Sequence, residues 1–158
     1  MLRAPNVIQV GGTQRGGGKT ALACAVVERF APAGVVGLKV TVLHAAEAGD
    51  MPPFTLEEEK SSAGPKDTAR MLASGAKRVW WLQTREESLT DAARAALQQI
   101  RAGTPVIAES NRLRLALQPG VFLMVHSDTE AVKPSAQRVM HLADQLVSEP
   151  AKWPVDAL

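Results

Sequence analysis

Short apolar runs alternate with longer amphipathic segments along most of this chain of 158 residues. Runs rich in β-branched residues predict five strands, at positions 7–10, 35–42, 78–82, 106–108 and 121–125. Helical periodicity predicts helices at positions 19–30 and 66–74, from 88 or 90 to about 102, and from 134 toward 146. Strands that alternate with helices indicate an α/β fold in three layers, with a mainly parallel sheet covered by helices on both faces.

A polar segment from about position 46 to 64 interrupts this alternation. It contains Pro52-Pro53, the charged run Glu57-Glu58-Glu59-Lys60 and the pair Ser61-Ser62. This composition predicts a loop rather than packed structure, and loops of this length in compact domains are functional or disordered. We therefore predict a single domain over positions 1–158 with a mobile loop at positions 44–66.

Composition narrows the expected partners and compartment. The 18 Lys and Arg residues nearly balance 16 Asp and Glu residues, and no long basic run or aromatic ladder interrupts them, so nucleic acid is not an expected partner. The single cysteine, Cys24, excludes an internal disulfide and suits a reducing compartment. No apolar run approaches the roughly 20 residues that cross a bilayer. These features predict a cytoplasmic protein without a membrane partner.

The most specific motif lies between the first predicted strand and the first predicted helix. It reads Gly12-Thr13-Gln14-Arg15-Gly16-Gly17-Gly18-Lys19-Thr20-Ala21 and predicts a P-loop, the Walker A motif of nucleotide-binding proteins. Glycines let successive backbone N–H groups converge on phosphate oxygens. Lys19 would then reach the outer phosphates, and the Thr20 hydroxyl would ligate Mg²⁺. The template places its first glycine at Thr13, whereas the chain has it one residue earlier, at Gly12, so the motif is off-template.

Three residues outside the motif, and Arg15 within it, are further candidates for the same site. Glu109 directly follows a predicted strand and is the best second ligand for Mg²⁺, although it could instead cap the next turn or form a surface ion pair. Asp67 could position the attacking water or respond to the terminal phosphate, but an aspartate that begins a helix also stabilises the helix dipole. Lys39 and Arg15 could add positive charge near the phosphates, and solvation is the simpler role for Arg15.

The sequence says least about the base of the nucleotide. The Asn-Lys-x-Asp element of many GTPases is missing, and the fifth predicted strand is followed only by His126-Ser127-Asp128. Asp128 could accept a hydrogen bond from a guanine edge, but a loop aspartate after a strand is common. Residues alone therefore leave guanine and adenine open.

Several spaced motifs carry a family resemblance: the glycine loop, Val36-Gly37-Leu38-Lys39-Val40-Thr41 with His44, Pro65-Lys66-Asp67-Thr68 with Arg70, Ser74-Gly75-Ala76, and Glu109. With them the chain resembles the MobB-like family, accessory GTP-binding proteins of molybdenum-cofactor biosynthesis that assist attachment of a guanine nucleotide to molybdopterin. The chain departs from that family at Val40, Pro65, Ser74 and Ser110-Asn111, where the family has histidine, glycine, alanine and glycine.

The resemblance implies a P-loop NTPase fold, a preference for GTP over ATP, and a molybdenum-cofactor nucleotidyltransferase as partner. The motif itself predicts Mg²⁺ as cofactor, and we expect slow hydrolysis because the residues show no tight transition-state machinery. The residues leave two other functions open. One is a small-molecule kinase in which the 44–66 loop encloses the acceptor and Asp67 is the base. The other is a nucleotide-binding module without catalysis, which acts through a partner enzyme or as a homodimer.

Overall fold

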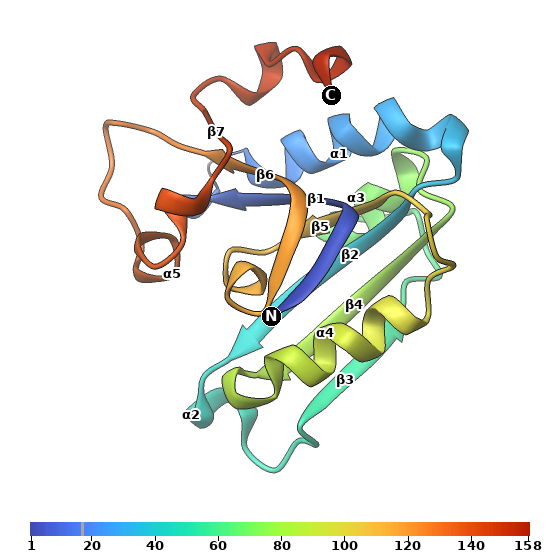
Figure 1. The fold of residues 1–158 in the computed structure, drawn as a ribbon, viewed down its shortest axis with the longest axis vertical. Helices are drawn as coiled ribbons and strands as arrows, with labels where there is room; N and C mark the ends of the chain where they lie inside the picture. The colour runs from blue at the N-terminus through green and yellow to red at the C-terminus, as the bar shows by residue number, and fades with distance from the viewer. Residues whose placement is uncertain (17) are drawn as a thin grey trace.

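The fold is built on a seven-stranded sheet, seen in a computed structural model that describes residues 1–16 and 18–158 (Figure 1). The strands are β1 (Leu2–Gly12), β2 (Val36–Leu43), β3 (Phe54–Glu58), β4 (Arg78–Arg85), β5 (Val106–Glu109), β6 (Leu117–Val125) and β7 (Gln145–Val147). Their order across the sheet is β3-β4-β2-β5-β1-β6-β7. All neighbours pair in parallel except β3 and β4, which are antiparallel. The predicted α/β architecture with a mainly parallel sheet is confirmed.

Helices cover both faces of this sheet (Figure 1). They are α1 (Lys19–Phe30), α2 (Ala45–Ala48), α3 (Asp67–Ala73), α4 (Leu89–Gln98) and α5 (Pro134–Gln137). Short 3₁₀ turns lie between them at Ala31–Ala33, Glu86–Ser88 and Arg112–Leu115, and after α5 at Met140–Leu142, Pro150–Lys152 and Val155–Ala157. Ile107 of β5 packs with α1 and α3, whereas its neighbours Val106 and Ala108 pack with α4 on the opposite face. This burial on both faces explains why the strand reads as a continuous apolar run.

The register of the three central strands brings the carboxyl ends of β1 and β5 beside the middle of β2. In the pairing of β5 with its two neighbours, Glu109 lies opposite Val10 of β1 and opposite Lys39 of β2. The glycine loop follows β1 directly and leads into α1. Residues separated by up to about a hundred positions in the sequence therefore meet on the central strands of the sheet.

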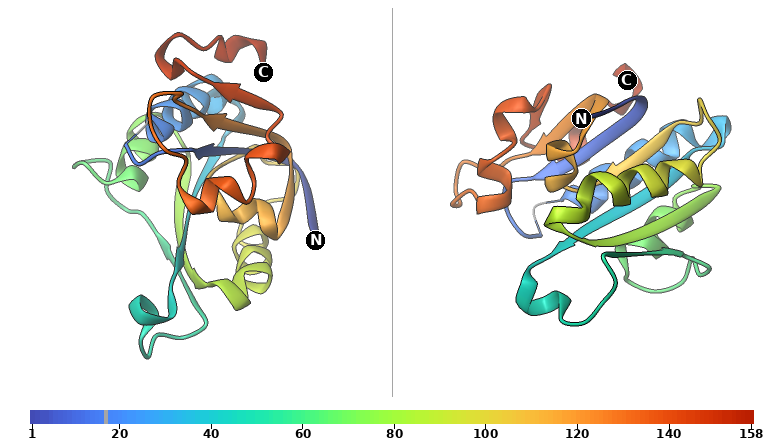
Figure 2. Two further views of the ribbon diagram at one scale, coloured as in Figure 1. Left: turned by 90° about the vertical axis from the view of Figure 1, so that its left-hand side faces the viewer. Right: turned by 60° about the horizontal axis from the view of Figure 1, so that its bottom comes forward.

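The prediction of a loop throughout positions 44–66 is wrong for two segments. The structure forms α2 and the edge strand β3 there, and α2 and the start of β3 project from the rest of the molecule (Figure 2). Phe54 and Leu56 pack on the core below α4, while Thr55 and Glu57 alternate with them. Charged residues are common on edge strands because they discourage pairing with other chains, and here they concealed the alternation.

The predicted last helix is also wrong beyond its first turn. Helix α5 ends at Gln137, and the chain returns to the sheet as β7, which pairs with β6. The backbone N–H of Phe122 donates to Asp144 Oδ2 at 2.7 Å, which fixes this return. Helix α4 likewise ends at Gln98 rather than near position 102. Local periodicity could not report the pairing with β6, which forms across more than twenty residues.

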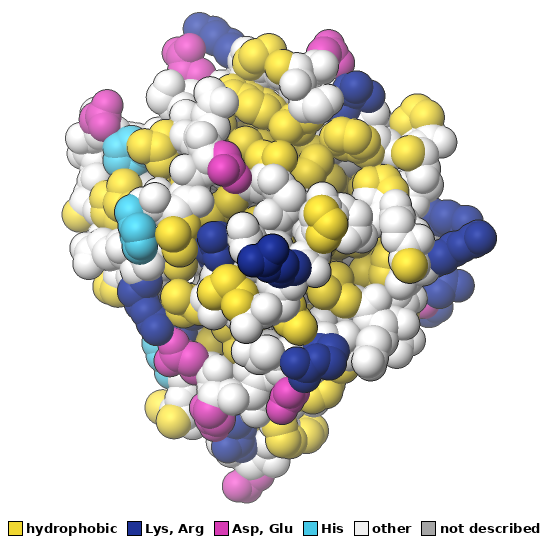
Figure 3. Space-filling view, in the orientation of Figure 1, with side chains coloured by type: hydrophobic (Ala, Val, Ile, Leu, Met, Phe, Trp, Pro, Cys, Tyr) yellow, Lys and Arg dark blue, Asp and Glu magenta, His cyan; other side chains and the backbone are white. Residues whose placement is uncertain are grey.

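The C-terminal segment packs on the domain beside α1 (Figure 1). Its Trp153, Val155 and Leu158 contact the apolar cluster that α1 contributes to the core. Among the described residues, no helix combines the length and apolar character that crossing a bilayer requires. On the face shown in Figure 3, basic and acidic side chains are interspersed with hydrophobic ones.

Candidate functional site

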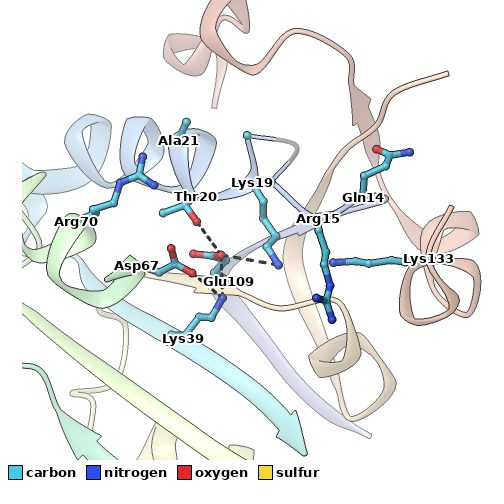
Figure 4. Close-up of a pocket in the computed structure, with 12 residues that line it drawn as sticks. Gln14, Arg15, Lys19, Thr20, Ala21, Lys39, Asp67, Arg70, Glu109 and Lys133 are labelled. Atoms are coloured by element: carbon cyan, nitrogen blue, oxygen red, sulfur yellow. Dashed lines mark hydrogen bonds and ion pairs between the residues drawn. The ribbon is translucent and has the colours of Figure 1, made fainter. Parts of the chain in front are cut away.

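A cavity of about 490 Å³ opens where β1 and β5 end, beside Lys39 of β2 and the start of α1 (Figure 4). It is lined by Gln14, Arg15, Gly16, Gly18, Lys19, Thr20, Ala21, Lys39, Asp67, Arg70, Glu109 and Lys133. We call it the larger cavity. It gathers most of the residues that the sequence analysis selected, from four different elements and the glycine loop.

Two described glycines of the loop, Gly16 and Gly18, adopt backbone conformations that other residues avoid. Gly16 has φ of +65° and Gly18 has φ of +91°, both in the left-handed region. Gly18 is also the N-cap of α1, and no side chain caps that end or places an acidic group in its first turn. The helix therefore directs uncompensated N–H groups and its positive dipole end toward the cavity. Gly17, part of the predicted motif, lies outside the described residues.

Glu109 is the centre of the site and is completely buried. Its Oε1 atom accepts a hydrogen bond from Thr20 Oγ1 at 3.1 Å and another from Lys39 Nζ at 3.0 Å. Lys19 Nζ lies 3.9 Å from the same oxygen. The other oxygen, Oε2, has no hydrogen-bond partner among the described residues. A buried carboxylate oxygen without a partner is costly, so this atom is available to a ligand of the cavity.

Lys39 joins the two carboxylates of the larger cavity. Its Nζ lies 3.0 Å from Asp67 Oδ2 and 3.0 Å from Glu109 Oε1. Burial favours neutral Lys39, but the charge and hydrogen bond of Glu109, with those of Asp67, raise its pKa above the ordinary value. Burial also opposes ionisation of Asp67, yet Lys39, Thr20 and Lys19 hold the pKa of this carboxyl below its usual range. Asp67 is thus an ion-pair partner and a weak base.

Basic side chains outnumber acidic ones around the larger cavity. The pKa of Lys19 is lowered to about 8 by burial, and by the positive charges of Lys39 and Lys133 against the opposing effect of the carboxylates. The pKa of Lys133 is lowered by burial and by the charges of Lys39 and Arg15. A bound anion would offset the repulsion between these positive side chains, because its negative charge would lie among them.

The first residues of the predicted motif hold the loop rather than line the cavity. The Asn111 side chain binds the Gly12 backbone twice: its Oδ1 accepts from the N–H at 2.8 Å, and its Nδ2 donates to the carbonyl at 2.9 Å. The Thr13 hydroxyl donates to Gln14 Oε1 at 2.5 Å, and the Gln14 amide donates to the Ser127 carbonyl at 3.1 Å. Gln14 nevertheless reaches the cavity wall.

Asp128 does not join the other predicted residues. Its side chain is 95% exposed, pairs with His126 Nε2 at 2.9 Å, and is absent from the lining of the larger cavity. Conversely, sequence reasoning missed Lys133 and the clamp formed by Asn111. Lys133 reaches the site because its backbone N–H donates to the Thr13 carbonyl at 2.9 Å, and a contact between residues so distant in the chain leaves no local pattern.

The two predicted magnesium ligands, Thr20 and Glu109, lie side by side in the larger cavity. The Thr20 hydroxyl contacts the Glu109 carboxylate, and Asp67 lies close by on the start of α3 (Figure 4). The described residues contain no group of three or more His, Cys, Asp or Glu that could hold a metal by themselves. Mg²⁺ needs fewer protein ligands, because it is bound through one or two carboxylates together with phosphates and water.

No protein family, curated protein or solved structure matches this chain. The resemblance to MobB-like proteins therefore stays a prediction.

Proposed function

We propose that this protein binds a nucleoside triphosphate with Mg²⁺ in the larger cavity, in the manner of a P-loop NTPase, and hydrolyses it slowly. One observation carries the proposal: the glycine loop joins a central strand to the free end of α1 and opens onto Lys19, Thr20 and the buried Glu109. Backbone N–H groups, a helix dipole and an ammonium group that converge in this way suit a phosphate chain.

The residues would share the work as follows. Lys19 and the N–H groups at the start of α1 bind and orient the outer phosphates, and Lys39 and Lys133 add positive charge beside them. Thr20 and Glu109 would hold Mg²⁺, which neutralises negative charge on the phosphates when it is bound. The Oε2 atom of Glu109, which has no hydrogen-bond partner in the described part of the chain, supports this assignment.

Slow turnover follows from the state of Asp67. Its carboxylate is tied to Lys39 at 3.0 Å and has a lowered pKa, so it accepts a proton from water poorly. A role in orienting the attacking water remains a prediction. An Asp67→Asn variant that hydrolyses the nucleotide at the wild-type rate would remove that role.

Guanine as the base, and an accessory role in molybdenum-cofactor biosynthesis, complete the proposal and rest on the family resemblance alone. A cytoplasmic location and a nucleotidyltransferase partner belong to the same resemblance. Asp128 contributes no support for guanine, because its carboxylate pairs with His126 outside the larger cavity.

Displacement of a fluorescent nucleotide from the protein by GTP or by ATP, with Mg²⁺ present, tests the proposal. We expect saturable binding that Lys19→Ala weakens at least about tenfold, since a charge-assisted contact is lost. Lys60→Ala is the matched control because Lys60 is 79% exposed and pairs only with Glu58 among the described residues. Equal binding by wild type and Lys19→Ala would refute the phosphate assignment, and tighter binding of ATP would refute the preference for guanine.

A further inference from the structure

A second cavity of about 300 Å³ adjoins the larger one. It is lined by Arg15, Lys19, Lys39, Val40, Thr41, Val42, Ser110, Asn111, Arg112, Lys133 and Ser135. We call it the smaller cavity. Arg15, Lys19, Lys39 and Lys133 line both cavities, so the two spaces meet at these basic side chains. Figure 4 shows Lys133 extending toward Arg15, which places two like charges side by side.

Charge distinguishes the smaller cavity from an ordinary surface hollow. Its described lining includes five basic side chains and no carboxylate. Together the two cavities have six basic side chains and two carboxylates, an excess of four positive charges. A triphosphate brings about four negative charges and its Mg²⁺ removes two, so about two positive charges stay unbalanced. A second small anion with about two negative charges would balance that remainder.

Two serine hydroxyl groups, one buried (Ser110) and one half-buried (Ser135), add directional contacts. Ser110 Oγ accepts a hydrogen bond from the Leu113 N–H at 3.2 Å, and Ser135 Oγ accepts one from Asn111 Nδ2 at 3.1 Å. In both contacts the serine oxygen is the acceptor, so each hydroxyl proton is free to be donated. Oxyanions accept such hydrogen bonds, and the basic groups around them supply the charge.

We propose that the smaller cavity binds a small phosphate- or carboxylate-bearing molecule at the same time as the nucleotide, beside the terminal phosphate. This inference rests on the proposed function, since the nucleotide fills the larger cavity in it. The volume of about 300 Å³ suits a molecule of a few carbon atoms and leaves no room for a second nucleotide. Among the basic side chains of the described lining, Arg112 alone lines the smaller cavity and not the larger one.

Calorimetry on the intact protein saturated with Mg²⁺ and a non-hydrolysable GTP analogue tests this site. The probes are 2-phosphoglycolate, which carries both anionic groups, and inorganic phosphate and malonate, which separate them. We expect about one equivalent of 2-phosphoglycolate to bind, and Arg112→Ala to weaken that binding about tenfold or more through the lost charge-assisted contact. The stronger of the other two probes identifies the preferred anionic group.

Arg114→Ala is the matched control, because Arg114 lies on the same 3₁₀ turn and lines neither cavity. It should bind 2-phosphoglycolate like the wild type, and both variants should keep the wild-type affinity for the analogue. Arg112→Gln repeats the test if Arg112→Ala folds poorly. The inference is overturned if the analogue binds but no probe shows saturable binding, or if both arginine variants bind the probe equally well. Failure of both this analogue and its ATP counterpart to bind refutes the proposed function, and this inference falls with it.

Discussion

Two strands of the sheet end in a glutamate, one at the centre of the sheet and one at its edge. The two carboxylates differ in how far they are removed from water. Glu109 ends the central strand β5 and is completely buried among Thr20, Lys39 and Lys19. Glu58 ends the edge strand β3 and pairs at 3.2 Å with Lys60, whose side chain is 79% exposed. Water screens the edge pair, whereas the central carboxylate interacts strongly with every charge around it. Position in the sheet, rather than residue type, makes Glu109 a functional candidate.

The largest expected effect comes from removing the central carboxylate. Glu109→Ala leaves Lys39 and Lys19 without their buried partner, so the free energy of unfolding should fall by about 3 kcal/mol. Urea unfolding followed by circular dichroism measures it. A loss below about 1 kcal/mol would mean that water screens this site as it does the edge.

The next effect concerns the buried lysine of the centre. Because the pKa of Lys19 is lowered to about 8 and phosphate binds the protonated form, nucleotide affinity should be constant below pH 8. Above that pH the free protein loses the proton that the complex needs, and the affinity should fall by up to about tenfold per pH unit. Calorimetry between pH 7 and 9.5 measures this, and Lys19→Arg should flatten the profile because arginine stays protonated. A flat wild-type profile would contradict the buried state of Lys19.

Two glycines with similar φ angles extend the comparison to a packed position beside the site and an open one away from it. Gly18 has φ of +91° and a Cβ there would lie 2.7 Å from Pro150 Cγ, whereas Gly64 has φ of +99° and open space around it. Gly64→Ala should therefore cost only the strain of positive φ, about 1 kcal/mol, and Gly18→Ala should cost more. Thermal unfolding of both variants compares them. Equal losses would show that the contact with Pro150 imposes no packing constraint.

The smallest effect is expected at the edge. Glu58→Gln removes an ion pair whose lysine is well exposed to water, so the free energy of unfolding should change by less than about 0.5 kcal/mol, and added salt should reduce even that change. The urea titration used for Glu109→Ala serves here too. A loss comparable with that of Glu109→Ala would abolish the distinction between centre and edge.

The pattern of apolar residues predicted the segments whose burial is regular along their length. The first helix has the predicted bounds 19–30 because Leu22, Ala23, Val26 and Val27 form one buried face. The strand at 106–108 was evident because both of its faces are buried. The edge strand β3 and the short β7 were missed because their pairing partners, β4 and β6, define them more than their own residues do.

By itself, the sequence determined the α/β alternation, the strand, glycine loop and helix around Lys19 and Thr20, and Glu109 and Asp67 as candidates. These are local properties: periodicity, glycine conformation and the residue types that suit phosphate and Mg²⁺. Only the tertiary structure decided that Lys39 bridges Glu109 and Asp67, that Lys133 joins the site, and that a second basic cavity lies beside the first. Such contacts depend on strand order and register, because these set which distant residues meet and how far each charge is removed from water.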